Sequence, residues 1–291
     1  MIGEQDEGFI PIRKKERHYS FDKTENLFHG IHHYTLQNGE TIAALSAQTW
    51  PEYLEYLSQV TDEDGLVVSP ELITFTGQPL DEVRENRELI EARIEEVKEE
   101  SRKHPSTLFL LGTPTFPEKG KPRNSVVFVQ NGGLISQAHK RTGATSKEYK
   151  TFDLLAEEPP SLIPETNIGL LICADIFSLL IFNSSQEGIE ERLRLFGKSN
   201  LIGAKPTFIH PEAKNLLVMS CWGVGGNRRW VKQVGPNQYY LEALRECAEG
   251  AMKMYPQLEA IIQVDRTPLM AEKDLPFTPT HPFNAFYQRK K

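Results

Sequence analysis

The sequence has little cysteine and no long hydrophobic run. Only three of its 291 residues are cysteines, and no two of them form a Cys-x-x-Cys pair. A disulfide scaffold is therefore excluded, and a reducing compartment is favoured. The longest apolar run lies around residues 178–182, far short of a membrane span, and the acidic first residues lack the apolar segment of a signal peptide. We therefore expect a cytoplasmic protein that makes no contact with a membrane.

The chain also lacks the excess of basic residues that is typical of nucleic-acid-binding proteins. It has 33 Lys and Arg against 40 Asp and Glu, a net charge of −7, so nucleic acid is not an expected partner. The segment 197–199 is not a phosphate loop, because Arg192 stands where that motif needs its first glycine. His29, His32 and His33 have no HExxH pattern or nearby cysteine to complete a metal site, so no metal is expected.

What is present is the patterning of an α/β domain, with 39% hydrophobic and 25% charged residues. Residues 1–40 are polar and weakly periodic, which indicates an N-terminal extension before one domain over residues 41–291. Apolar runs and helical periodicity predict the following elements: strands at 41–47, 65–69, 107–112, 125–130, 134–138, 168–172, 215–220 and 259–265, and helices at 80–102, 186–198 and 237–254. Asn131-Gly132-Gly133 predicts a hairpin turn, and the proline-rich residues 266–291 are expected to be irregular.

Three of the predicted strands are followed by side chains that can carry chemistry. Glu71 follows the strand at 65–69, Lys140 follows 134–138, and Cys173 follows 168–172. Taken alone, Cys173 is most simply a small hydrophobic core residue. Active sites of α/β proteins form at the carboxyl ends of strands, and a thiol, a carboxylate and a cation together suit nucleophilic attack on a carbonyl or nitrile carbon.

These residues resemble the motifs of the carbon–nitrogen hydrolase (nitrilase/amidase) superfamily. Pro70-Glu71 is similar to the family's first motif, His139-Lys140-Arg141 to its lysine motif, and the segment 169–175 to its nucleophile motif. The spacings are similar as well, with 69 residues from Glu71 to Lys140 and 33 from Lys140 to Cys173. The resemblance covers roughly residues 65–178. It implies a four-layer α-β-β-α sandwich.

The resemblance also implies roles for the site residues. Glu71 would be the general base, Cys173 the nucleophile that forms a thioester acyl-enzyme, and Lys140 the cation that stabilises the oxyanion together with the backbone N–H of Ala174. Asp175 follows the nucleophile as in the family motif. Since these groups are all supplied by the chain, no cofactor is expected.

A second glutamate is carried over by spacing alone. Glu148 lies eight residues after the lysine, where the family has a glutamate that orients the lysine. Candidate substrate-pocket residues follow from position alone: Thr74, Phe75, Phe177 and Trp222. After the nucleophile the sequence departs from the family pattern, since Ala174 replaces the usual aromatic residue. Only residues 266–291 remain where the family usually adds further strands, which leaves open a trimmed or rebuilt second sheet.

The sequence therefore predicts a thiol-dependent hydrolase of non-peptide carbon–nitrogen bonds that acts on a small-molecule amide or nitrile. Amide hydrolysis is preferred, because Cys-x-Asp resembles the amidase-type members. Three alternatives stay open: a nitrilase or an acyl-transferring member, an inactive binding or regulatory protein on the same fold, and an unrelated α/β enzyme in which Cys173 is core. By analogy with the family, a homodimer or higher homo-oligomer is expected.

Overall fold

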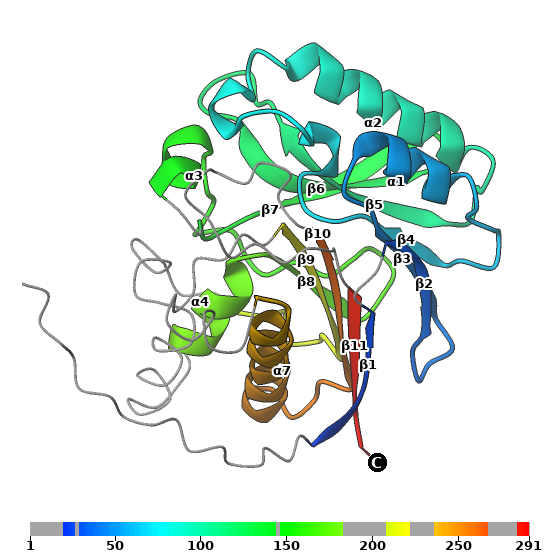
Figure 1. The fold of residues 1–291 in the computed structure, drawn as a ribbon, viewed down its shortest axis with the longest axis vertical. Helices are drawn as coiled ribbons and strands as arrows, with labels where there is room; N and C mark the ends of the chain where they lie inside the picture. Colours follow the sequence, from blue (N-terminus) through cyan, green and yellow to red (C-terminus); the bar gives the residue numbers. More distant parts are fainter. Residues whose placement is uncertain are drawn as a thin grey trace, which may run out of the picture.

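Two β-sheets face each other, and helices cover their outer faces (Figure 1). This computed structural model describes residues 20–26, 29–143, 146–182, 208–221, 236–266 and 284–290. The layers follow the order helix, sheet, sheet, helix. The predicted α/β class and α-β-β-α sandwich are therefore confirmed.

The first sheet has the strand order β2-β3-β4-β5-β6-β7. Its strands are β2 (Gly30–Thr35), β3 (Thr41–Ser46), β4 (Leu66–Val68), β5 (Leu108–Thr115), β6 (Arg123–Gln130) and β7 (Gly133–His139). Strands β3, β4 and β5 are parallel, whereas β2, β6 and β7 pair with their neighbours in antiparallel fashion. The predicted hairpin joins β6 to β7, with Asn131 at φ 47° and Gly132 at φ 75°, a left-handed pair that a tight two-residue turn requires.

The second sheet has the strand order β1-β11-β10-β9-β8. Its strands are β1 (Phe21–Asn26), β8 (Ile168–Ile172), β9 (Asn215–Cys221), β10 (Ala260–Arg266) and β11 (Asn284–Arg289). Strands β8, β9 and β10 are parallel, and β11 runs antiparallel between β10 and β1. The expectation of an irregular tail is wrong for residues 284–289, because Asn284, Ala285 and Tyr287 are buried in this sheet.

Residues 1–40 contribute one edge strand to each sheet. Strand β1 pairs with β11 and buries Phe21, and β2 pairs with β3 and buries Tyr34. The predicted boundary after residue 40 thus falls in the connection between β2 and β3. The division of the chain into an extension and one domain stays a prediction.

Helices form where the sequence offers amphipathic patterns and caps. They are α1 (Trp50–Leu57), α2 (Arg87–Ser101), α3 (Ser146–Thr151), α4 (Asp175–Phe182) and α7 (Pro236–Met254), with 3₁₀ turns η1 (Ile73–Phe75) and η2 (Leu80–Glu82). A capping box between Thr49 and Glu52 starts α1. The helix predicted over 80–102 is divided, because Asn86 has non-helical dihedral angles before α2. The helix predicted at 186–198 lies outside the described residues.

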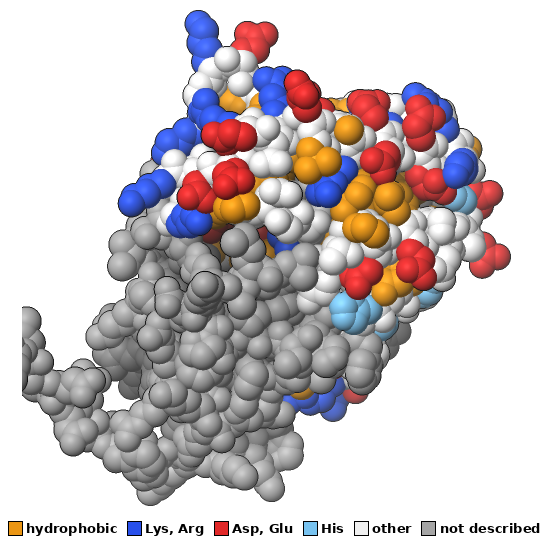
Figure 2. Space-filling model, turned by 45° about the horizontal axis from the view of Figure 1, so that its top comes forward, with side chains coloured by type: hydrophobic (Ala, Val, Ile, Leu, Met, Phe, Trp, Pro, Cys, Tyr) orange, Lys and Arg blue, Asp and Glu red, His pale blue; other side chains and the backbone are white. Residues whose placement is uncertain are grey.

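Three hydrophobic layers hold the sandwich together. The middle layer packs the facing sides of the two sheets, including Ile42, Val68 and Ile172. The outer layers pack the first sheet under α1 and α2 and the second sheet under α4 and α7. Acidic and basic side chains are interspersed on the surface over α1 and α2 (Figure 2). None of the helices in the described segments is long and apolar enough to cross a bilayer.

Candidate active site

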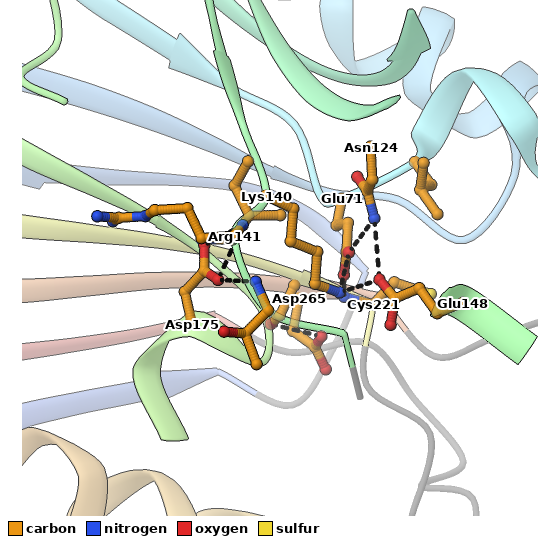
Figure 3. A network of polar contacts seen from close by, with 12 residues as sticks. Glu71, Asn124, Lys140, Arg141, Glu148, Asp175, Cys221 and Asp265 are labelled. Atoms are coloured by element: carbon orange, nitrogen blue, oxygen red, sulfur yellow. Dashed lines mark hydrogen bonds and ion pairs between the residues drawn. The ribbon is translucent and has the colours of Figure 1, made fainter. Parts of the chain in front are cut away.

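The carboxyl ends of strands from both sheets meet at one end of the sandwich. Strands β4 and β7 of the first sheet lead to Glu71 and Lys140, and β8 and β9 of the second sheet lead to Cys173 and Cys221. Figure 3 shows Glu71, Lys140 and Glu148 turned toward one another, with Cys221 beside them. Glu71, Lys140 and Cys221, from the ends of three separate strands, are therefore brought together, and Cys173 follows β8, the neighbour of β9.

Lys140 lies between two buried carboxylates. Its Nζ donates to Glu71 Oε1 at 2.8 Å and also to Glu148 Oε1. The Lys140 side chain is only 2% exposed. Burial by itself would lower the pKa of Lys140, but electrostatic interaction with Cys173, Glu148 and Glu71 raises it well above its ordinary value. Lys140 therefore stays charged, as an electrostatic clamp must.

The Glu71 carboxylate is held from three sides. Its Oε1 accepts from Lys140 and from Asn124 Nδ2, the latter at 2.7 Å, and its Oε2 accepts from the backbone N–H of Cys221 at 2.8 Å. Asn124 Nδ2 also lies 3.3 Å from Glu148 Oε1. Among the described residues, Oε2 accepts only that one hydrogen bond, so it keeps a lone pair for a further proton.

The backbone of Glu71 is also tied to the opposite sheet. Its N–H donates to Ser220 O at 3.3 Å, and its carbonyl accepts from Arg266 Nε at 2.8 Å. The next residue, Leu72, has φ 54°, and Gly112 of β5 approaches this turn closely. The position of Glu71 thus depends on contacts with β9 and β10 as well as on its own strand.

Cys173 occupies a sharp turn between β8 and α4. It has φ 49°, and its N–H donates to Met219 O at 2.9 Å. The residue is 5% exposed. Burial raises the pKa of the Cys173 thiol well above its usual value, the charge of Glu71 raises it further, and Lys140 opposes the shift. The resting thiol is therefore neutral, and it needs a base before it can act as a nucleophile.

Asp175 joins the segment after Lys140 to the turn that carries Cys173. Its Oδ1 accepts from the N–H groups of Arg141 at 3.1 Å and Thr142 at 2.8 Å, and its Oδ2 accepts from Ile172 N at 3.2 Å. Figure 3 shows its carboxylate among these backbone groups. Burial raises the pKa of Asp175 to about 6, against the effect of Arg141 and Lys140. Ala174, next to it, is buried as well.

Of the four pocket candidates, the structure describes the side chains of Thr74 and Phe75. Phe75 is buried and packs with Leu72, Val83 and Ile90, which is core packing. Thr74 is buried and hydrogen-bonded to the hydroxyl of Thr113 at 2.6 Å. Trp222 and the side chain of Phe177 lie outside the described residues, so their part in a pocket stays a prediction.

Three residues at the site were not among those predicted from the sequence: Cys221, Asn124 and Arg266. Cys221 carried a signal, since it ends an apolar strand just as Cys173 does. Asn124 lies inside β6, and its contacts with both carboxylates follow only from the pairing of the strands. Arg266 carried the same signal as Cys221, since it ends the apolar strand β10. No three His, Cys, Asp or Glu residues of the described segments are grouped to hold a metal ion.

Comparison with known proteins links this fold to a superfamily. No protein-family model matches the sequence, and neither does any curated protein. Among solved structures, a glutamine-dependent NAD+ synthetase from Acinetobacter baumannii in complex with ADP has a TM-score of 0.54 at 15% identity, covering 86% of this chain. This chain spans only 47% of the synthetase.

Two further matches cover nearly all of both chains. A cysteine-to-alanine mutant of the Nesterenkonia AN1 amidase, from the nitrilase superfamily, has a TM-score of 0.50 at 13% identity and covers 97% of this chain and 94% of its own. A double mutant of the amidase from Nesterenkonia sp. AN1 in complex with acrylamide has a TM-score of 0.50 at 12% identity, with coverages of 96% and 93%. The chain therefore has the fold of the nitrilase superfamily.

Proposed function

We propose, for a chain with the nitrilase-superfamily fold, that this protein is a carbon–nitrogen hydrolase that cleaves small amides through a thioester on Cys173. The observation that carries the proposal is the buried ammonium of Lys140, which is hydrogen-bonded to both Glu71 and Glu148 and interacts electrostatically with Cys173. A buried arrangement of thiol, carboxylates and cation is costly to maintain, and it contains each group that acyl transfer requires.

In this proposal, Glu71 is the general base, and Oε2 is its reactive oxygen. Oε1 already accepts two N–H bonds, whereas Oε2 keeps a free lone pair. Oε2 takes the proton from the Cys173 thiol as the sulfur attacks the substrate carbonyl. Because burial and the charge of Glu71 keep the thiol neutral at rest, proton transfer must accompany the attack.

The oxyanion formed by attack is stabilised by Lys140 and by the backbone N–H of Ala174. The ammonium of Lys140 is held in place before the reaction, so it does not have to reorganise as negative charge develops. When the carbonyl re-forms, the C–N bond breaks, and the leaving nitrogen takes the proton from Glu71. Ammonia or an amine departs, and a thioester to Cys173 remains.

Hydrolysis of the thioester uses the same groups in a second cycle. Glu71 takes a proton from water, the hydroxide attacks the thioester carbon, and Lys140 again stabilises the oxyanion. The C–S bond then breaks, the sulfur recovers its proton from Glu71, and the carboxylic acid departs. Glu148 orients Lys140 throughout, through its own hydrogen bond to Nζ.

The test is ammonia release from a panel of small amides, ureas and nitriles, with acrylamide included because a structural neighbour is described in complex with it. Wild type is compared with Cys173→Ala and with Cys247→Ala. Cys247 is a matched control, because it is a buried cysteine of α7 that packs against the second sheet and does not lie at the strand ends.

We expect release from amides in wild type and in Cys247→Ala, and none in Cys173→Ala. Release from nitriles alone would identify a nitrilase instead. Release that survives in Cys173→Ala would refute the thiol mechanism. A folded wild-type protein that releases ammonia from no member of the panel would favour an inactive relative with a binding or regulatory role.

A further inference from the structure

Arg266, the last residue of β10, reaches from the second sheet to the turn that carries Glu71 in the first. Its Nε donates to the carbonyl of Glu71 at 2.8 Å, and its Nη2 lies 3.4 Å from the carbonyl of Leu72. The side chain is buried, with 6% of the residue exposed. A buried guanidinium that donates to two successive carbonyls fixes the orientation of that backbone, because its planar group holds the N–H donors at fixed angles to one another.

The turn that Arg266 contacts is one that needs support. Leu72 has φ 54°, a left-handed conformation that a leucine adopts only where its surroundings impose it. On one side the turn lies against Gly112, where no side chain is available to hold it. On the other side, Arg266 supplies hydrogen bonds to both carbonyls of the turn. The direction in which the Glu71 side chain leaves the backbone therefore depends on Arg266.

The positive charge of Arg266 lies near two buried carboxylates. Glu71 and Glu148 are two buried carboxylates that share one ammonium, that of Lys140. Arg266 brings a second buried cation to the same end of the sandwich. Its charge reaches the thiol of Cys221, since it acts against the burial that raises the pKa of Cys221 to about 12.

We propose that Arg266 is a positioning residue that holds Glu71 in line with Cys173 across the two sheets. The proposal rests on the proposed function, in which Glu71 takes the proton from the thiol. Arg266 does not touch the reacting atoms in this scheme. It acts by fixing the turn from which the base projects, and a displacement of about 1 Å in such a group can cost about 100-fold in rate.

The chain offers a matched control in Arg289. This arginine also donates to two backbone carbonyls, with Nε to Leu258 O at 2.9 Å, in the connection before β10, and Nη2 to Met252 O at 2.7 Å, in α7. It lies on β11, away from the strand ends that carry the site. Arg289→Ala therefore removes the same kind of clamp without touching the turn of Glu71.

The experiment measures the rate at which iodoacetamide alkylates Cys173 as a function of pH, followed by peptide mass, in the full chain. The variants are Arg266→Ala, Arg266→Lys, Arg289→Ala and Glu71→Gln, each checked for a cooperative melt. We expect Arg266→Ala to lower the rate at neutral pH by about tenfold to 100-fold and to move the rise of the profile to higher pH. Guanidinium ion, at concentrations too low to unfold the protein, should restore part of the rate to Arg266→Ala alone.

Arg266→Lys keeps the charge and one donor, so we expect a smaller loss, and it carries the test if Arg266→Ala does not fold. Arg289→Ala should keep the wild-type profile, whatever its melting temperature. A wild-type profile in a folded Arg266→Ala or Arg266→Lys would overturn the proposal, as would an equal loss in Arg289→Ala.

Glu71→Gln distinguishes a failure of the proposed role of Arg266 from a failure of the proposed function. If Glu71→Gln reacts slowly while Arg266→Ala behaves as wild type, only the role of Arg266 falls. If Glu71→Gln itself has the wild-type profile, Glu71 is not the base, and the proposed function and the role of Arg266 fall together.

Discussion

Replacing Gly112 by alanine should disturb the site without adding or removing any polar group. Gly112 lies in β5, and its N–H donates to Ser69 Oγ at 2.8 Å. A Cβ at this position would lie 2.3 Å from Pro70 O, 2.8 Å from Glu71 Cα and 2.9 Å from Leu72 N. All three atoms belong to the backbone, so no flexible side chain can turn aside. The turn that carries Glu71 must move instead.

The size of the effect follows from these distances. Ordinary contacts of a Cβ begin near 3.4 Å, so the contact with Pro70 O is too short by about 1 Å. Overpacking of this kind typically costs about 1–3 kcal/mol of unfolding free energy, and the upper end is expected where only backbone can yield. If Glu71 is the general base, as proposed, a shift of about 1 Å in its position predicts a loss of about 100-fold in amide turnover.

Urea unfolding and ammonia release together test this prediction. Gly133→Ala is the control, because a Cβ there would meet only Gln130 O at 3.5 Å, an ordinary contact. We expect Gly133→Ala to stay within about 0.5 kcal/mol of wild type with full activity. A Gly112→Ala protein with wild-type stability and turnover would refute the claim that this glycine is needed for the close approach of β5 to Glu71.

Three further predictions concern charge and topology. Lys140→Met leaves Glu71 and Glu148 without their cation, so it should lower the unfolding free energy by about 3–5 kcal/mol, and a wild-type unfolding free energy in denaturant titrations would contradict this. Asp175 has its pKa raised to about 6 in the fold from an ordinary value of 3.8, so the folded state binds more protons than the unfolded state between those values. The unfolding free energy of wild type relative to Asp175→Asn should therefore fall by up to about 3 kcal/mol as pH rises from about 4 to about 6 and then stay level, and a rise over that range would show that the carboxylate form is the one the fold favours. Deleting residues 284–291 removes β11, which leaves β1 without its partner strand and exposes one edge of β10, so we expect aggregation in size-exclusion chromatography rather than a monodisperse folded protein.

The sequence places candidate residues at strand ends from local patterns alone. Glu71 and Lys140 each follow an apolar run of the first sheet and Cys173 follows one of the second, and strands that run in the same direction carry the residues after them to the same end of their sheet. The alternation within β3, where Ile42 and Ala44 face the other sheet and Ala43 and Leu45 face the helices, is equally local. Such features depend on residues close together in the chain.

Other features depend on pairings that no local pattern specifies. The contacts of Asn124 with both carboxylates require the register of β6 against its neighbours. Those of Arg266 require the two sheets to be stacked at one particular offset. Strand β11 was not predicted because its alternation of Ala285, Tyr287 and Arg289 is short and ends in charged residues.

The pairing of β1 with β11 has a consequence for the order of folding. These are the first and last described strands, and Phe21 lies opposite Arg289. During synthesis, β1 emerges long before the partner that satisfies its backbone, while the first sheet can assemble from segments that follow one another more closely. Closing so large a loop is entropically slow. The second sheet should therefore be the last part to form, and amide protons of β1 should acquire protection from hydrogen exchange later than those of β4 and β5.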